Sequence, residues 1–270
     1  MSNSAGIQAE TQAQGGIQVG TPDVVAASTF PQYAYGTLLA AFLARRLGLG
    51  EVSVAELGVA GGNGLVELER VAAEIGAAQG VKVGTYGFDL GSGMPTPVDH
   101  RDNPSMWQHG FFKMDEELIR SHLTSAELVL GDIADTGPRF MRSGAAPIGF
   151  LSFDLDYYSS TVVAMKALLE ESPEHYLPRI VCYFDDTVGP HEELHSEFTG
   201  ELLAIKEFNA AHEHRKIGRI NGLRYKLLPM TESNDEFSWI EGMYVLHLFD
   251  HPLYNQYVYP DADRQFPLGG

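Results

Sequence analysis

The chain has 270 residues, of which 44% are hydrophobic, so it can form one α/β domain with a sizeable core. Its 36 acidic residues outnumber its 18 lysines and arginines and give a formal net charge of −18. Such a surface repels phosphate backbones, which argues against DNA or RNA as a partner. The single cysteine, Cys182, excludes a disulfide within the chain. Without an apolar run of membrane length or a secretory leader pattern, we expect a cytoplasmic protein that does not bind membranes.

The chain divides into a short N-terminal region and a long remainder of different composition. Residues 1–21 are rich in Gln, Gly, Ala and Ser, which is typical of a flexible tail. Residues 22–270 are expected to form one domain. Within it, residues 33–49 have the apolar spacing of an amphipathic helix. This helix is interpreted as an N-terminal cap over a ligand site, and a plain packing helix is the alternative.

The most informative segment is an apolar run that begins at residue 52 and ends in an acid and a cluster of glycines. It predicts a buried strand, a glycine loop at Gly58, Gly62 and Gly64, and a helix over residues 65–78. Glycines allow a sharp turn and let a ligand approach the backbone closely. Glu56 precedes the first glycine, and an acid there suits a cationic ligand better than a pyrophosphate. A tight turn without a ligand is the alternative.

Further strand signals alternate with helical patterns along the rest of the chain. Strands are predicted over residues 83–89, 128–132, 148–156 and 180–185, with helices over 160–171 and 192–213 and closing strands over 225–229 and 243–249. Strands that alternate with helices form a parallel sheet with right-handed crossovers. The fold class is therefore α/β: a doubly wound, mostly parallel, Rossmann-like sheet of seven strands with a C-terminal antiparallel hairpin.

A long irregular stretch, residues 90–110, follows the second predicted strand. Loops of this length are uncommon in compact domains and often cover a binding site. Trp107 lies near its far end, and Phe111 and Phe112 follow it. We expect a lid whose aromatic rings contact an acceptor substrate. The alternative is a surface loop that its tryptophan pins to the core.

Acidic residues follow the predicted strands after the glycine loop, at the edge of the sheet where ligands bind. They are Asp89, Asp132, Asp154, Asp156, Asp185 and Asp186. Helix N-capping could explain one or two of these acids but not the two pairs. The position of Asp89 fits an acid that binds ribose hydroxyls. Asp156, Asp185 and Asp186 supply the hard carboxylate oxygens that Mg²⁺ prefers, and a dication would offset their mutual repulsion.

These motifs resemble those of a known enzyme family. The pattern from Glu56 through Gly58 and Gly62 to Gly64 resembles the first motif of class I S-adenosylmethionine (SAM) methyltransferases. DLDYYSST at 154–161, FDDT at 184–187 and the helix at 204–212 resemble the macrocin (TylF-like) sugar O-methyltransferases. Leu155 and Thr187 depart from that family's pattern, where a glycine and an aromatic residue are usual.

The resemblance implies a role for each candidate residue. Glu56, Gly58, Gly62 and Gly64 would bind SAM, with Asp89 at the ribose and Asp132 at the adenine amino group. Asp156, Asp185 and Asp186 would hold the metal ion. Asp156 or His191 would accept the proton of the substrate hydroxyl, although His191 could equally be a surface residue.

The expected function is Mg²⁺- and SAM-dependent O-methylation of a hydroxyl on a small acceptor, a sugar-containing or polyhydroxylated natural product. Two alternatives stay open: other SAM-dependent chemistry such as N-methylation, and a non-catalytic binding protein with the same fold. Homo-oligomerisation is also left open.

Overall fold

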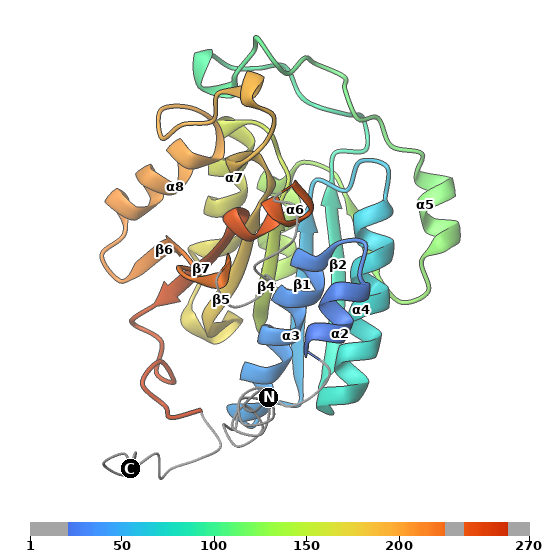
Figure 1. The fold of residues 1–270 in the computed structure, drawn as a ribbon, viewed down its shortest axis with the longest axis vertical. Helices are drawn as coiled ribbons and strands as arrows, with labels where there is room; N and C mark the ends of the chain where they lie inside the picture. Colours follow the sequence, from blue (N-terminus) through green and yellow to red (C-terminus); the bar gives the residue numbers. More distant parts are fainter. Residues whose placement is uncertain (1–20, 225–234, 259–270) are drawn as a thin grey trace, which may run out of the picture.

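The structure, a computed structural model, describes residues 21–224 and 235–258 and is built on a seven-stranded sheet with helices on both faces (Figure 1). The strand order is β3-β2-β1-β4-β5-β7-β6. The first five strands are mutually parallel, and β7 is antiparallel to both β5 and β6. The strands are β1 (Glu51–Leu57), β2 (Lys82–Asp89), β3 (Glu127–Leu130), β4 (Ile148–Phe153), β5 (Tyr176–Phe184), β6 (Arg215–Arg219) and β7 (Met243–Leu248).

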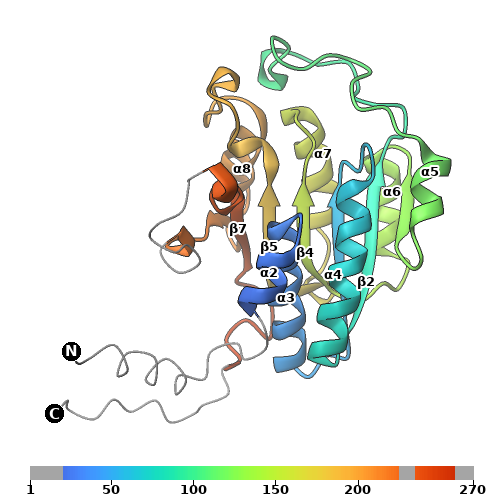
Figure 2. The same ribbon diagram turned by 45° about the vertical axis from the view of Figure 1, so that its right-hand side comes forward.

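Helices cover both faces of this sheet. They are α2 (Thr21–Ala27), α3 (Pro31–Arg46), α4 (Asn63–Gln79), α5 (Glu116–His122), α6 (Ile133–Met141), α7 (Tyr158–Leu169) and α8 (Gly200–Ala211). The pair α3 and α4 packs on one face, whereas α6, α7 and α8 follow one another on the other face (Figure 2). None of the helices in the described part of the chain is long and apolar enough to cross a membrane.

The two faces of the sheet form two separate hydrophobic cores because side chains alternate along each strand. Phe150 and Val181 pack in the core beneath α3 and α4. Their neighbours Leu151 and Cys182 point the other way, into the core beneath α6, α7 and α8. Burial on both faces explains why the central strands read as continuous apolar runs rather than as alternating ones.

The architecture confirms the predicted plan of a doubly wound, mostly parallel seven-stranded sheet that ends in an antiparallel pair. The predicted start of one helix was wrong by eight residues. The helix expected over 192–213 begins only at Gly200, and residues 191–193 form a separate short 3₁₀ turn. Leu194, directly after that turn, has a left-handed backbone (φ 54°), which breaks the helical path.

The antiparallel pair also differs from the expectation in its outer strand. β7 is confirmed, but its outer partner β6 is formed by Arg215–Arg219. The expected strand over 225–229 lies outside the described residues, as do residues 1–20 of the tail expected over 1–21, whose last residue, Thr21, begins α2. Ile217 faces the core between exposed or basic neighbours, so the charges of this short edge strand concealed its pattern.

Candidate functional site

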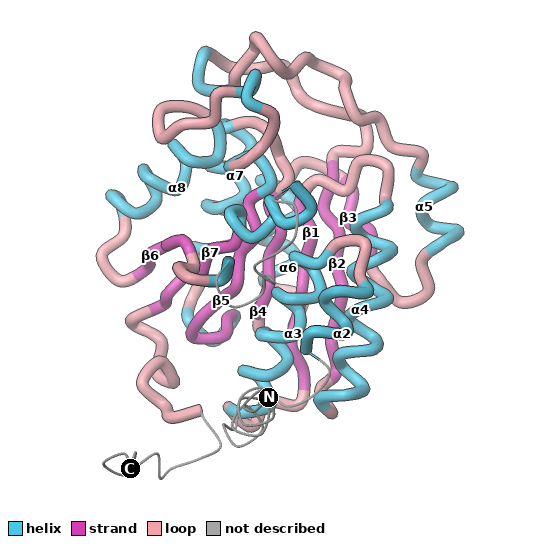
Figure 3. Tube along the Cα trace, in the orientation of Figure 1, coloured by secondary structure: helices cyan, strands magenta, loops and turns pink. Residues whose placement is uncertain are grey.

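A cavity of about 760 Å³ opens at the carboxyl ends of the parallel strands. The long loops after the strands gather at this end of the sheet (Figure 3). The glycine loop after β1, the ends of β2 and β4, and the segment after β5 all contribute to its lining. The residues predicted from the sequence that line it are Gly58, Asp89, Asp132, Asp154, Asp156, Asp185 and Asp186.

The glycine loop packs so closely that side chains would not fit at two of its positions. A Cβ on Gly58, which has φ of 92°, would lie 1.8 Å from the carbonyl oxygen of Asp154. A Cβ on Gly64 would lie 1.9 Å from Oε1 of Glu56. Gly62, at φ of 85°, adopts the left-handed turn that starts α4. Contacts and backbone geometry therefore require the glycines of the predicted motif.

Glu56 lies in the interior and does not line the cavity. Its Oε1 accepts a hydrogen bond of 2.6 Å from the hydroxyl of Tyr33 on α3. Its Oε2 has no hydrogen-bond partner among the residues that the structure describes. Burial, followed by the charge of Asp89, raises the pKa of Glu56 to about 8. Glu56 is thus held between α3 and the glycine loop through Oε1, while Oε2 makes no hydrogen bond with the described residues.

Asp89, the last residue of β2, links the strand to the glycine loop. Its Oδ2 accepts hydrogen bonds from the backbone N–H groups of Val59 (2.9 Å) and Ala60 (3.0 Å), and its Oδ1 from Gly91 (2.6 Å). A carboxylate offers about four acceptor positions, so capacity remains for a hydroxyl from the cavity side.

Asp132 begins the next helix along the sheet. Its Oδ1 accepts a hydrogen bond of 2.9 Å from the N–H of Ala134, so Asp132 is the N-cap of α6. Capping was the alternative to a ligand contact for the strand-end acids, and it applies here. Because Asp132 also lines the cavity, its contact with an adenine amino group stays a prediction.

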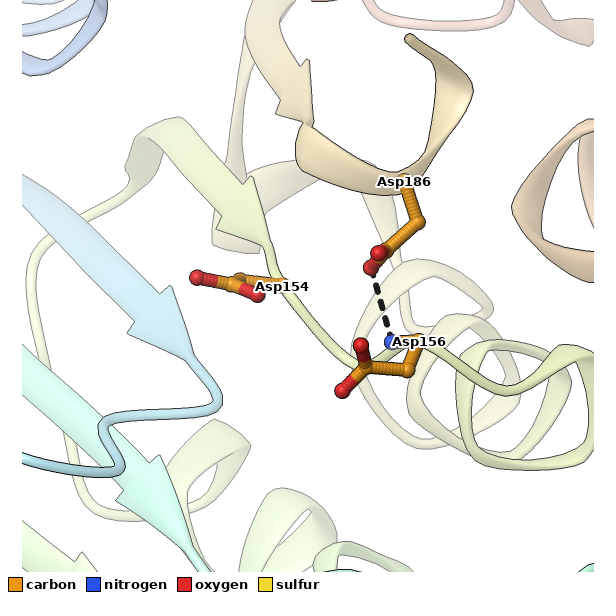
Figure 4. Close-up of side chains that lie close together, drawn as sticks. All are labelled: Asp154, Asp156 and Asp186. Carbon is orange, nitrogen blue, oxygen red and sulfur yellow. Dashed lines mark hydrogen bonds between the residues drawn. The ribbon is translucent and has the colours of Figure 1, made fainter. Parts of the chain in front are cut away.

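Three carboxylates meet at the ends of β4 and β5. Each of Asp154, Asp156 and Asp186 offers one oxygen, and these atoms lie within 4.8 Å of one another (Figure 4). Asp154 follows β4 directly, and the 3₁₀ turn after β5 carries Asp186. The backbone N–H of Asp156 donates a hydrogen bond of 2.8 Å to Oδ2 of Asp186.

Burial and mutual repulsion disfavour negative charge in this cluster. They raise the pKa of Asp156 to about 7 and the pKa values of Asp154 and Asp186 well above the usual range. Behind the cluster, the fully buried Glu201 accepts a hydrogen bond of 3.2 Å from the N–H of Asp186. A set of hard oxygen donors with excess negative charge fits a divalent cation such as Mg²⁺.

Asp185 is the predicted metal ligand that this cluster does not include. Its Oδ1 accepts a hydrogen bond of 2.6 Å from the hydroxyl of Tyr183. Asp185 and Asp186 are consecutive in a tight 3₁₀ turn, so their side chains point in different directions. The structure therefore brings together two of the three predicted ligands and adds Asp154, which the sequence pattern had already placed among the strand-end acids.

The predicted proton acceptor His191 lies away from the cavity lining. Its side chain is 93% exposed and contacts Glu192 at 3.1 Å. In contrast, Glu193 lines the cavity, and its Oε2 lies 2.7 Å from Nε2 of His195. Glu193 is not among the residues predicted from the sequence, because a continuous helix was expected where the structure has the short 3₁₀ turn that carries it.

The loop over residues 90–110 contributes Trp107 to the cavity wall, together with Phe112 beyond it. Its main attachment is Asp102, which is completely buried. The Asp102 carboxylate accepts hydrogen bonds from the N–H (2.8 Å) and hydroxyl (2.9 Å) of Ser159 on α7. No local pattern in the sequence distinguishes this acid from its neighbours, because its partner is 57 residues away.

No family model matches the sequence, and no curated protein is significantly similar to it. Solved structures do match this chain. The O-methyltransferase NovP is 16% identical, with 67% of this chain and 72% of that chain covered and a TM-score of 0.48. The calicheamicin methyltransferase CalS11 is 18% identical, with 92% and 94% covered and a TM-score of 0.47. The mycinamycin-pathway methyltransferase MycE, solved with Mg and SAH, is 14% identical, with 73% and 44% covered and a TM-score of 0.36.

All three of these structures are named as methyltransferases. At these identities and TM-scores the similarity does not assign an activity to this chain.

Proposed function

We propose that this protein is a SAM-dependent O-methyltransferase that requires a divalent cation and methylates a hydroxyl of a sugar-containing or polyhydroxylated natural product. One observation carries the proposal: the carboxylate cluster of Asp154, Asp156 and Asp186 shares a single cavity with the glycine loop and Asp89. A methyl donor and an acceptor hydroxyl beside a divalent cation would need such a common space, because the reaction joins the donor and the acceptor directly.

The part of the cavity at β1 and β2 suits SAM. Gly58 and Ala60 expose the backbone of the glycine loop there, and Asp89 has acceptor capacity left for the ribose hydroxyls. Asp132 follows β3, which lies next to β2 in the sheet, and its carboxylate would accept a hydrogen bond from the adenine amino group. The acidic lining suits the ammonium and sulfonium groups of the donor.

Asp154, Asp156 and Asp186 would hold the metal ion, and Asp185 lines the same cavity beside them. When bound, a divalent cation supplies a Lewis acid that lowers the pKa of a coordinated hydroxyl and orients it.

The protein's own residues complete the transfer. Asp156 accepts the proton of the acceptor hydroxyl, because its carboxylate lines the cavity that the acceptor enters. The hydroxyl oxygen forms a bond to the methyl carbon while the carbon–sulfur bond of SAM breaks, which leaves S-adenosylhomocysteine. Trp107 and the loop around it exclude water from this step. His191 stays a prediction as a second proton acceptor.

Calorimetric titration with SAM, followed by methyl-transfer assays with labelled SAM, tests the proposal. We expect SAM to bind, and transfer to stop in EDTA and return with Mg²⁺. The absence of SAM binding at millimolar concentration refutes the proposal. Full turnover in EDTA instead supports metal-independent SAM chemistry, such as N-methylation.

A further inference from the structure

The charged residues that line the cavity are all acidic. Its acidic lining residues are Asp89, Asp132, Asp154, Asp156, Asp185, Asp186 and Glu193. Within the described part of the chain, its lining includes no lysine, arginine or histidine. Arg101 and Lys113, in the segment after β2, are not part of the lining, and Arg101 is paired with Asp99 at 2.8 Å.

The proposed cofactors account for only part of this charge. A divalent cation and SAM, which carries a net single positive charge, leave acids in excess. Asp89 and Asp132 also have structural partners in backbone N–H groups. Glu193 differs from both, because it accepts no backbone hydrogen bond among those described and caps no helix.

Glu193 is nevertheless held in one place. Its Oε2 lies 2.7 Å from Nε2 of His195, and the two side chains are only 16% and 10% exposed. Gly189 makes room for this pair, since a Cβ there would lie 2.1 Å from the same oxygen of Glu193 and 2.9 Å from Nε2 of His195. This fixed carboxylate lines the cavity from the segment after β5, apart from the glycine loop after β1, and is available to an acceptor that shares the cavity with SAM.

We propose that the cavity selects acceptors whose reacting part is neutral or cationic and rejects anionic ones, with Glu193 as a specificity-determining residue and His195 as its positioning residue. This inference rests on the proposed function. An anionic group inside the cavity would face several carboxylates in a partly desolvated space, where like charges repel strongly. A hydroxyl or an ammonium group would instead donate a charge-assisted hydrogen bond to Glu193. The cavity therefore excludes acceptors whose reacting part is a phosphorylated sugar or a uronic acid.

Three probes with one sugar skeleton test the selection: methyl glucoside, methyl glucosaminide and methyl glucuronide, assayed with labelled SAM and Mg²⁺. We expect kcat/KM for the neutral and amino sugars to exceed that for the uronate at least tenfold. Glu193→Gln should reduce that preference at least threefold. Glu197→Gln is the matched control, because Glu197 lies in the same segment but is exposed and pairs with Lys206 at 3.0 Å. Efficient methylation of the uronate overturns the inference.

If none of the three sugars is methylated, tryptophan fluorescence decides. The chain has two tryptophans, and Trp239 is buried, so quenching in the complex with S-adenosylhomocysteine and Mg²⁺ reports mainly on Trp107 at the cavity wall. We expect the ratio of the iodide quenching constant to the acrylamide quenching constant to be at least fivefold lower in the protein than for a free tryptophan amide. Glu193→Gln, unlike Glu197→Gln, should raise quenching by iodide. Equal quenching by both probes, unaffected by Glu193→Gln, overturns the inference.

The failures of the two proposals are distinguishable. Loss of SAM binding refutes the proposed function, and the quenching comparison, then made without S-adenosylhomocysteine, still decides on the charge of the cavity. Intact SAM binding together with efficient uronate methylation refutes only the charge selection.

Discussion

The backbone N–H of Asp156 donates a hydrogen bond to Oδ2 of Asp186, and this bond joins the ends of β4 and β5 at the centre of the sheet. Asp156 has a left-handed backbone with φ of 57°, a conformation that costs roughly 1–2 kcal/mol for most residues. Strain and buried negative charge at one residue are typical of positions kept for function rather than for stability.

Asp156→Asn should therefore stabilise the metal-free protein while it abolishes activity. Asparagine tolerates the left-handed backbone and removes a buried charge, so we expect a higher melting temperature at pH 8. Methyl transfer should fall at least 10²-fold, the usual contribution of a general base. Thermal melts and labelled-SAM assays measure both. A variant that melts lower yet turns over normally would contradict this role of Asp156.

Asp154→Asn and Asp185→Asn separate the two possible sets of metal ligands. In the structure Asp154 shares the cluster with Asp156 and Asp186, whereas the Asp185 carboxylate accepts from the hydroxyl of Tyr183. We expect Asp154→Asn to weaken Mn²⁺ binding at least tenfold, about 1.4 kcal/mol, and Asp185→Asn to weaken it less. Titration with Mn²⁺ by electron paramagnetic resonance measures both. A larger loss with Asp185→Asn would restore the set expected from the sequence.

Glu56 makes stability depend on pH. Its pKa is about 8 in the folded protein, against an ordinary value of 4.5, so between these values the native state binds more protons than the unfolded state. Stability is then lost as the pH rises through this window, by up to about 1.4 kcal/mol per pH unit. We expect Glu56→Gln to flatten the decline between pH 5 and 8 in urea titrations. An unchanged slope would show that Glu56 is ionised in the fold.

The glycine loop provides a comparison between adjacent positions. Gly62→Ala adds a Cβ 2.6 Å from Ile119 on α5 at a left-handed backbone, whereas a Cβ on Gly61 has nothing within 4 Å. We expect Gly62→Ala to cost at least about 2 kcal/mol of unfolding free energy through overpacking and strain and to weaken SAM binding. Gly61→Ala should change stability by less than about 0.5 kcal/mol. Urea unfolding and calorimetry measure the two effects, and equal costs would contradict the packing argument.

Two substitutions in the loop over residues 90–110 should distinguish its attachment to the fold from its contact with the acceptor. Asp102→Ala removes the buried contacts with Ser159, so the loop should become sensitive to limited proteolysis. Trp107→Ala, at the cavity wall, should leave melting and SAM binding unchanged but lower acceptor turnover at least tenfold, about 1.4 kcal/mol. If Trp107→Ala instead lowers the melting temperature and leaves acceptor kinetics unchanged, the loop is merely pinned by its tryptophan.

Local patterns in the sequence determined the sheet and the glycine turn. Buried parallel strands need continuous apolar runs, and the turn after β1 needs backbone without side chains, so both features are visible in short windows. The acids after the strands are also visible in short windows, because each of them follows an apolar run directly. Parallel strands end at one edge of the sheet, so these acids were expected to lie near one another. The strand β6 was missed because its only large apolar residue, Ile217, lies between Lys216 and the exposed Gly218, at an edge that tolerates polar residues.

Only the tertiary structure decided which acids share a site. The 3₁₀ turn after β5 directs Asp185 and Asp186 differently, and Asp156, with its left-handed backbone, lies in one cluster with Asp154 and Asp186. The pairs of Asp102 with Ser159 and of Glu56 with Tyr33 join residues 57 and 23 positions apart, so no local window contains both partners. Side-chain direction at a turn and contact across the fold depend on packing of the whole chain, and for that reason residue types and spacing alone predicted the location of the site but not its final geometry.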